Sequence, residues 1–467
     1  MPTFESQSNY DIRLPMMSPR VHVVGGGLAG SEAAYFLAEK GISVVLHEMR
    51  PAKSTPAHET DQFAELVCSN SLKSQVPHSA PGILKAEMRQ FGSLILKCAA
   101  ETAVPGGDAL TVDRDLFAQS ITRALKSHPK ITIVPGEVTE PFQDEITLFA
   151  TGPLTSDRLG TWFAKATQTQ DLYFYDAIAP IVDASSIDMN SAFLANRYDK
   201  GGEEAYINCP FSESEYQTFI DALMVAEKVP PKPFEKEKFF QGCQPIEAIA
   251  NTGRDSLRFG PMKPVGLIDP RTGQRPYAVV QLRPENLGKT AYNLVGFQTK
   301  LKYGEQSKVF RLIPALRNAE FLRLGSIHRN TYVCSPKVLR SDLSLKGHPK
   351  VYLAGQITGV EGYLESAACG LLSAIFITQR LQGLPHQAPP VNTGMGAILK
   401  QIIGSDPDHF EPTNIHFGLF DPNFFQNLNG LKKDEIRQSM AIQAVQNFTN
   451  WRIQTEFERK KANAHSS

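Results

Sequence analysis

The stretch from Val21 to Gly30, VHVVGGGLAG, decides the fold. A short apolar run leads directly into glycines at 25, 27 and 30, the spacing G-x-G-x-x-G. Gly25 permits a tight turn out of a strand, Gly27 lets a pyrophosphate lie against the backbone, and Gly30 lets the next helix pack closely on the strand. The N-terminus of that helix offers free N–H groups and a positive dipole end to phosphates. The stretch therefore predicts a dinucleotide site.

The residues that follow support this interpretation. Residues 31–40 have helix-forming composition, Gly41 ends the helix, and residues 42–46 form a second apolar strand. Glu48 stands at the end of that strand, 18 residues after Gly30, where an acidic residue would bind the ribose hydroxyls of an ADP group. The alternative is a glycine-rich turn in an ordinary βαβ unit, which the complete strand, turn, helix, strand and acid pattern disfavours.

A second strand–glycine–helix unit lies near the other end of the chain. Residues 351–359, VYLAGQITG, are an apolar strand that runs into a turn, and residues 361–377 form a helix with small side chains on one face. Residues 146–149 form a further buried strand that runs into Gly152. One early and one late unit, without a second complete G-x-G-x-x-G, favour FAD over NAD. The predicted cofactor-binding residues are Gly25, Gly26, Gly27, Leu28, Ala29, Gly30, Glu48, Gly152, Gly355 and Gly359.

Composition excludes several classes of protein. The 467 residues suggest two or three domains, and 42% hydrophobic content is that of a globular protein. Six scattered cysteines contain no C-x-x-C pair, so neither a zinc site nor a redox disulfide is predicted, and no metal is expected. Sparse cysteine fits a reducing cytoplasm. Residues 1–19 lack the apolar core of a signal peptide and are expected to be a disordered extension, and no window reaches the about 18 apolar residues of a membrane span.

The middle of the chain has a different character. From about residue 165, aromatic and polar residues alternate and prolines cluster, which indicates a separate mixed domain inserted into the first. We predict an α/β fold, a Rossmann-like FAD-binding domain of the glutathione-reductase type with an inserted α+β domain. The predicted FAD-binding domain comprises residues 20–165 and 325–467, and the inserted substrate domain comprises residues 166–324.

Several elements outside the motifs are also predicted. Residues 82–100 are read as one amphipathic helix, 116–126 as a second helix, and 131–134 as a short strand. Residues 252–266 are rich in glycine and proline and are expected to be a loop. A final helix is expected from about residue 433 to residue 457.

Charge is distributed unevenly along this neutral chain. Residues 251–330 hold 14 Lys and Arg against 5 Asp and Glu, a local net charge of +9, so the remainder carries −9. A basic region on an otherwise acidic protein is what binding to a phosphate backbone requires. A solvated basic face explains the charge equally well.

Seven segments resemble one family closely, the folate- and FAD-dependent tRNA uracil-5 methyltransferases of bacteria. The resemblance covers nearly the whole chain past residue 20. Besides the first glycine turn, its segments are Cys68–Lys73, Gly242–Pro245, Thr252–Gly266, His328–Thr331, Ala354–Gly359 and Phe417–Phe420. The glycine motifs and the His-Arg-Asn-Thr run are shared with a larger relative that modifies the wobble uridine of tRNA and carries a long C-terminal helical domain. The 467 residues leave no room for such a domain, which favours the methyltransferase.

The resemblance implies C5-methylation of uridine-54 in the T loop of tRNA. It implies FAD, with methylenetetrahydrofolate and NADPH or NADH as co-substrates, and Cys243 as the thiolate that adds to uracil C6 with assistance from Cys68. A thiolate at C6 makes C5 nucleophilic, and a reduced flavin supplies the hydride that converts a one-carbon unit to methyl. Without the resemblance, a single cysteine is more often buried and inert, which we expect of Cys98 and Cys369.

Three other functions are kept as alternatives. A small-molecule flavin oxidoreductase would need no RNA, but neither a redox cysteine pair nor a nicotinamide domain is evident in the sequence. An FAD-containing enzyme that modifies the wobble uridine shares the glycine motifs. A tRNA-folding protein that retains flavin would not need a catalytic thiol.

Overall fold

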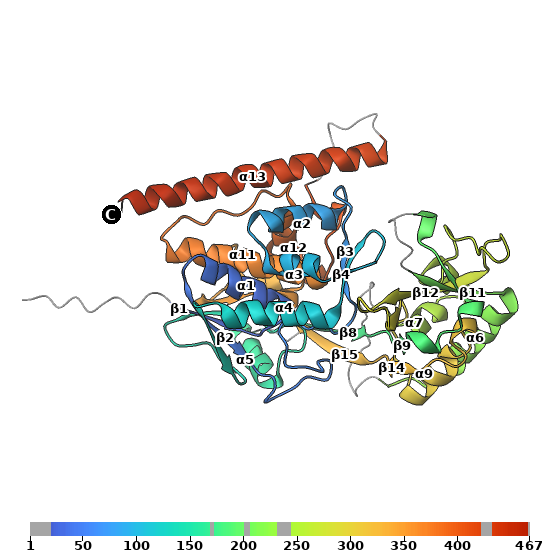
Figure 1. Cartoon of the computed structure of the whole chain (residues 1–467). Coiled ribbons are helices and arrows are strands. Elements are labelled where there is room, and N and C mark those ends of the chain that lie inside the picture. Colours follow the sequence, from blue (N-terminus) through green and yellow to red (C-terminus); the bar gives the residue numbers. More distant parts are fainter. Residues whose placement is uncertain (1–19, 169–171, 200–205, 231–243, 422–431, 466–467) are drawn as a thin grey trace, which may run out of the picture.

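The computed structural model describes residues 20–168, 172–199, 206–230, 244–421 and 432–465, which form two bodies side by side (Figure 1). The first contains the glycine turn and both ends of the described chain. The second is formed by the middle of the chain. Residues 1–19, for which we predict disorder, lie outside the described residues.

The first body is built on a six-stranded sheet in the order β16-β17-β7-β1-β2-β6. The strands β1 (Arg20–Val24), β2 (Ser43–Glu48), β6 (Ile131–Pro135), β7 (Ile146–Phe149) and β17 (His348–Leu353) are parallel, and β16 (Ser344–Leu345) is an antiparallel edge. Strand β17 pairs with β7 although about 200 residues separate them in sequence. The predicted doubly wound nucleotide-binding sheet, completed by the late strand, is confirmed.

Two helices with small side chains pack over the glycine turn. They are α1 (Leu28–Glu39) and α11 (Tyr363–Leu381), and they make the most extensive helix–helix contact in the described chain. A side chain at Gly370 of α11 would overlap the backbone of Ala29 in α1, so the close approach requires glycine there. The small-residue face predicted for the late helix is therefore its contact with the early helix.

The prediction of one helix over residues 82–100 is wrong, because two helices occupy this segment. Helix α2 (Ala80–Gln90) ends at Phe91, and Gly92 follows with φ +73°. The Ser93 hydroxyl then accepts a 3.2 Å hydrogen bond from the Leu96 N–H and starts α3 (Leu94–Glu101). The amphipathic pattern continues through the break, since both helices face the same core.

The other predicted helices and strands are present, with shifted ends. Helix α4 (Arg114–Ser127) begins two residues before its predicted start, and the Asp113 side chain caps it. The final helix α13 (Lys433–His465) continues past residue 457 along the first body (Figure 1). The remaining helices of this body are α5 (Asp157–Thr167), α10 (Ser335–Val338) and α12 (Gly394–Gly404).

The second body is an antiparallel sheet covered by helices, which confirms the inserted α+β domain. Its strand order is β10 (Phe193–Leu194), β11 (Ile207–Phe211), β12 (Ala278–Pro284), β13 (Ala291–Leu294), β9 (Ile181–Asp183) and β14 (Phe321–Arg323). Helices α6 (Glu213–Val225), α7 (Ile246–Asn251) and α9 (Tyr303–Phe310) accompany it. Residues 252–266 are mostly irregular, as predicted, apart from the one-turn helix α8 (Ser256–Phe259).

Two small sheets lie between these parts. Strands β8 (Leu172–Ala177) and β15 (Ile327–Tyr332) pair antiparallel where the chain leaves and re-enters the first body, and β3 (Ser71–Ser74), β5 (Ala109–Val112) and β4 (Ala103–Val104) form the other sheet. The first body has a hydrophobic core formed by residues from the ranges 21–163 and 333–451. The second body has its own core, formed by residues from the range 179–319. The boundaries at 165/166 and 324/325 stay a prediction that is compatible with these cores. No helix among the described residues is long and apolar enough to cross a membrane.

Candidate active site

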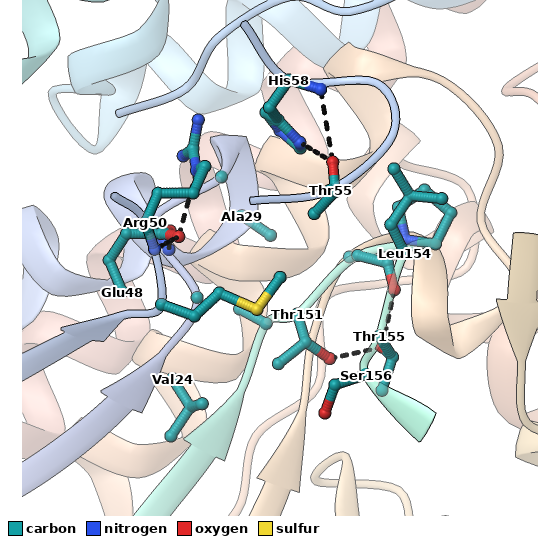
Figure 2. A pocket seen from close by; sticks show the side chains of 18 of the residues that line it. Val24, Ala29, Glu48, Arg50, Thr55, His58, Thr151, Leu154, Thr155 and Ser156 are labelled. Carbon is teal, nitrogen blue, oxygen red and sulfur yellow. Dashed lines mark hydrogen bonds and ion pairs between the residues drawn. The ribbon is translucent and has the colours of Figure 1, made fainter. Parts of the chain in front are cut away.

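A cavity opens at the carboxyl ends of the parallel strands, above the glycine turn (Figure 2). Eight of the ten predicted cofactor-binding residues line it, namely Gly25, Gly26, Gly27, Leu28, Ala29, Glu48, Gly152 and Gly355. In open α/β sheets, ligands bind in the crevice outside these strand ends. We call this the dinucleotide cavity.

The three motif glycines have different surroundings. Gly25 has φ +103°, and a Cβ there would lie 2.6 Å from Ala150 O. A Cβ on Gly30 would overlap Gly25 O, so Gly30 allows the helix to pack on the turn and does not itself line the cavity. A Cβ on Gly27 would meet no protein atom within 4 Å, although Gly27 lines the cavity. A phosphate group of a ligand could therefore lie directly against the backbone at Gly27.

Glu48 is held rigidly at the end of β2. One carboxylate oxygen accepts a 2.8 Å hydrogen bond from the Gly26 N–H, and the other accepts bonds from Arg50 N–H at 3.0 Å and Arg50 Nε at 3.1 Å. Burial acts to raise the pKa of this carboxyl, but the hydrogen bonds and charge of Arg50 outweigh it and lower the pKa. A charged acid thus stands in the cavity wall, and its contact with a ribose stays a prediction.

A polar loop that sequence reasoning did not assign covers part of the cavity. Thr55 bonds the His58 ring at 2.6 Å, and Arg50 joins Glu65 at 3.2 Å; all four side chains line the cavity. Burial lowers the pKa of His58 to about 4, so its ring is neutral at pH 7. The polar run after Glu48 was the available signal, but only the tertiary structure shows that it folds back. Other lining residues that sequence reasoning missed include His47, Thr151, Thr155, Ser156, Gln356 and Tyr363.

The late turn contributes one of its two predicted glycines. Gly355, with φ +79°, lines the cavity and approaches the Ala29 side chain. Gly359, with φ +81°, caps the short helix η6 (Gln356–Thr358) and faces the Phe410 ring. It lines neither this cavity nor the second cavity that adjoins it. Its binding role stays a prediction, and its observed contacts are structural.

A second cavity adjoins the first. Val67, Pro153, Leu154, Gln356 and Tyr363 line both. Its other walls come from both bodies: Cys68, Lys73 and Asn414 belong to the first, whereas Ile178 and Gln298 belong to the second. We call it the thiol cavity because Cys68 is the one cysteine among the described residues that lines it.

The peptide units of Cys68 are fixed on both sides. Its N–H donates to the Tyr363 hydroxyl at 2.7 Å, and its carbonyl accepts from the Arg114 guanidinium at 3.1 Å. The Ser69 N–H also donates to Tyr363, at 3.3 Å. Burial and the neighbouring Cys68 raise the pKa of Tyr363, so the phenol stays protonated. The half-buried thiol is therefore carried by a well-ordered loop.

A charged cluster forms another part of the wall. The Lys73 ammonium bonds both the Glu365 carboxylate and the Asn414 side-chain oxygen, and Glu365 also accepts a 2.8 Å hydrogen bond from the Ile415 N–H. Behind it, the buried Lys85 donates to Ser74 O at 2.8 Å, and burial lowers the pKa of Lys85 to about 7. The cluster places an ammonium group and an amide at the cavity surface.

The other described cysteines do not reach either cavity. Cys98 and Cys369 are buried in the first core, as predicted, and Cys209 and Cys334 are also buried. Cys243 lies outside the described residues. The described chain resumes at Gln244, and the N–H of Ile246 donates at 2.8 Å to the carbonyl of Gln298, a residue of the thiol-cavity wall. In the described part of the chain, no group of three or more His, Cys, Asp or Glu side chains could hold a metal ion.

This architecture is that of a two-domain, dinucleotide-binding α/β protein. The glycine turn lies at the ends of parallel strands, the late strand–turn–helix unit completes the site, and a cavity that contains a thiol adjoins it. The family model described as glucose inhibited division protein A matches residues 20–385. The chain belongs to this family, and within it to the methylenetetrahydrofolate–tRNA-(uracil-5-)-methyltransferases TrmFO.

The comparisons behind this assignment cover most of the chain. The TrmFO protein of Koribacter versatilis is 51% identical over 93% of this chain and 98% of its own length. That of Myxococcus xanthus is 52% identical over 92% and 94%. The solved structure of Aquifex aeolicus GidA has a TM-score of 0.68 at 16% identity, covering 96% of this chain and 75% of its own. The last likeness supports the fold alone.

Proposed function

We propose that the protein methylates C5 of the T-loop uridine of tRNA, using methylenetetrahydrofolate as carbon donor and FAD as redox cofactor. One observation carries the proposal: the cavity that contains Cys68 shares a wall with the dinucleotide cavity. A base and a one-carbon donor held there would lie against a flavin bound in the dinucleotide cavity. The relatives named above carry the name of this reaction.

The residues present fit FAD. The open face of Gly27 suits a pyrophosphate, the helix α1 N-terminus behind it favours anions, and Glu48 stands where an ADP ribose would lie. Gly152, Gly355 and Gln356 also line the dinucleotide cavity, and Gln356 lines the thiol cavity as well. These residues would hold FAD, and the cofactor, once reduced by NADPH or NADH, would supply the hydride that turns the methylene unit of the folate into a methyl group.

The chain itself contributes two thiols. Cys243 as a thiolate adds to uracil C6, which makes C5 a nucleophile toward the one-carbon unit, and it leaves again when the C5 proton is lost. Cys68, at the cavity surface, assists in removing that proton. The support for Cys243 is the resemblance of the segment Gly242–Pro245 to the methyltransferase family.

The inserted domain supplies a surface suited to RNA. Lys263 and Arg275 are exposed, and neither forms an ion pair with any described acidic residue. Four residues before Lys263, at the end of α8, the Phe259 side chain is 82% exposed, which offers a face for base stacking. By contrast, Lys302 and Lys308 on the α9 side are paired with Glu227 and Glu305. Part of the net charge of +9 over residues 251–330 is therefore carried by Lys263 and Arg275, which no described acidic residue neutralises.

The test combines the purified protein, methylenetetrahydrofolate, NADPH and a tRNA transcript, and maps new 5-methyluridine by nuclease digestion and mass spectrometry. We expect methylation in the T loop only, and a tRNA affinity that falls steeply with salt. Modification at the wobble position would favour the related tRNA-modifying function. NADPH oxidation without salt-dependent tRNA binding would favour a small-molecule oxidoreductase.

A cysteine variant tests the mechanism. Cys243→Ala should lower 5-methyluridine formation by at least about 1000-fold, because the nucleophile is lost. Cys334→Ala is the matched control, since Cys334 is buried away from both cavities. Undiminished methylation by Cys243→Ala would contradict the assignment of the nucleophile. Methylation of the transcript would also exclude a purely RNA-folding role.

A further inference from the structure

The loop that carries Cys68 is held by an ion pair between the two bodies. Arg114, the first residue of α4, uses three nitrogens: Nε bonds the Glu285 carboxylate, one terminal nitrogen bonds Leu66 O, and the other bonds Cys68 O at 3.1 Å. Glu285 directly follows β12 of the inserted domain. Both side chains are largely buried, with 14% and 5% exposure. The guanidinium therefore links the inserted domain to the backbone on both sides of Val67.

Asn70 makes a second connection at the same place. Its amide nitrogen donates to Val112 O in β5 and to Pro284 O in β12, both at 2.9 Å, and its amide oxygen accepts from Arg283 Nε at 2.9 Å. Asn70 is fully buried. One side chain thus joins the loop to the first body and to the last residues of β12.

These contacts leave Cys68 little freedom. Its N–H is fixed by Tyr363 and its carbonyl by Arg114, so rotation of the side chain is the main motion left to the thiol. Arg114 depends in turn on Glu285 for its counter-charge. The second oxygen of Glu285 is buried and has no hydrogen-bond partner among the described residues, so Arg114 is its one charged contact there. Moving β12 relative to the first body would displace the guanidinium and with it the Cys68 carbonyl.

We infer that Arg114 and Glu285 are a positioning pair, which makes the location of the Cys68 thiol depend on the docking of the inserted domain. The inference rests on the proposed function, in which RNA binds the inserted domain and Cys68 acts on the base. An arginine is required because its planar fork reaches three acceptors at fixed angles, whereas a lysine ammonium has no such fork. The pair does not line either cavity, so it acts through Cys68 and not on the substrate.

The experiment compares Arg114→Lys and Glu285→Gln with the control Tyr206→Phe. The Tyr206 hydroxyl makes a 3.1 Å bond to Gly106 O, another contact between the two bodies that does not touch the Cys68 loop. We expect kcat for tRNA methylation to fall about 100-fold in Arg114→Lys and about tenfold in Glu285→Gln, because small misplacements of a reacting group have effects of this size. The KM for tRNA and the flavin content should stay within about twofold of wild type. Tyr206→Phe should behave as wild type.

A second measurement does not depend on the proposed function. The rate at which iodoacetamide alkylates Cys68, followed by peptide mass spectrometry of the flavin-containing protein, should rise at least about fivefold in Arg114→Lys, because a loop freed from its carbonyl contact exposes the half-buried thiol. Unchanged alkylation with unchanged kcat would overturn the inference, as would a rise in KM alone or an equal effect of Tyr206→Phe. If the wild type forms no 5-methyluridine, the proposed function fails, while the alkylation rates still decide whether the pair positions Cys68.

Discussion

The two neighbouring cavities are built in different ways. The dinucleotide cavity is assembled within the first body, from turns at the ends of β1, β2 and β7 and from the late turn after β17. The thiol cavity combines residues of both bodies, including Cys68, Asn414 and Gln298. The first can form wherever the parallel sheet forms, whereas the second exists only when the inserted domain is docked. Cofactor binding and methylation should therefore be separable by mutation.

The largest separation is expected from Cys68→Ala. Methylation should fall by about 100-fold to 10,000-fold, the usual contribution of a general acid or base, while the flavin absorbance of the purified protein is kept. The thiol lines only the second cavity, so its loss should not disturb the first. Cys98→Ala, which alters a buried cysteine of α3, is the control. Loss of flavin together with activity in Cys68→Ala would mean that the two cavities are not independent.

Damage to the dinucleotide cavity alone is expected from Gly27→Ala. The added methyl group meets no protein atom within 4 Å and Gly27 has φ −72°, so folding should be unaffected. The methyl group projects into the dinucleotide cavity, and crowding a packed ligand costs about 1–3 kcal/mol, so FAD affinity should fall about 10-fold to 100-fold. Fluorescence titration of the apoprotein with FAD gives the affinity, and circular dichroism reports the fold.

Gly304→Ala provides the comparison, since a Cβ there also meets open space but lies on α9, away from both cavities. It should bind FAD as the wild type does. Equal affinities for Gly27→Ala and the wild type would show that the open face of Gly27 does not meet the cofactor.

The smallest effect concerns acid stability of the first body. His47 lines the dinucleotide cavity and bonds His22 at 2.9 Å, and His22 bonds Glu145 at 2.6 Å. Burial lowers the pKa of His47 to about 4, below the 6.5 of an unfolded histidine. The unfolded chain therefore binds more protons between pH 6.5 and pH 4, and the stability of the folded state falls as the pH falls through that window.

His47→Gln removes this proton uptake. Between pH 6.5 and pH 5, the melting temperature of wild type should fall about 2 °C more than that of the variant, as measured by differential scanning calorimetry. His348→Gln is a control, because His348 is exposed at the start of β17. Identical acid slopes for wild type and His47→Gln would contradict a neutral buried His47.

The fold was predictable where a short segment of the sequence determines the backbone geometry. The apolar run before Gly25 predicts β1, and the glycines predict the turn because Gly25 needs positive φ and Gly30 needs close packing. The break between α2 and α3 was missed, because the apolar face continues through Gly92 and the pattern alone does not register a change of helix direction. Gly359 was assigned by analogy to the turn, but its observed neighbour is Phe410.

The candidate site was only partly predictable. Cys68 was singled out by resemblance, whereas the residues that hold it, Arg114, Tyr363 and Glu285, carry no pattern that links positions so far apart in sequence. Likewise, Arg50 and His58 are ordinary polar loop residues until the loop folds over the cavity. Contacts between distant segments depend on how two bodies dock, which local periodicity does not encode.

Strand periodicity and glycine geometry act over a few residues, so the parallel sheet and its glycine cradle could be predicted from short segments, and a change in residue pattern indicated the inserted domain. The tertiary structure alone decided that the two glycine units meet at α1 and α11, that a second cavity opens beside the first, and that an arginine of one body and a glutamate of the other hold the Cys68 loop. These features depend on the packing of segments up to about 340 residues apart, and hydrogen bonds and ion pairs buried between those segments hold them in place.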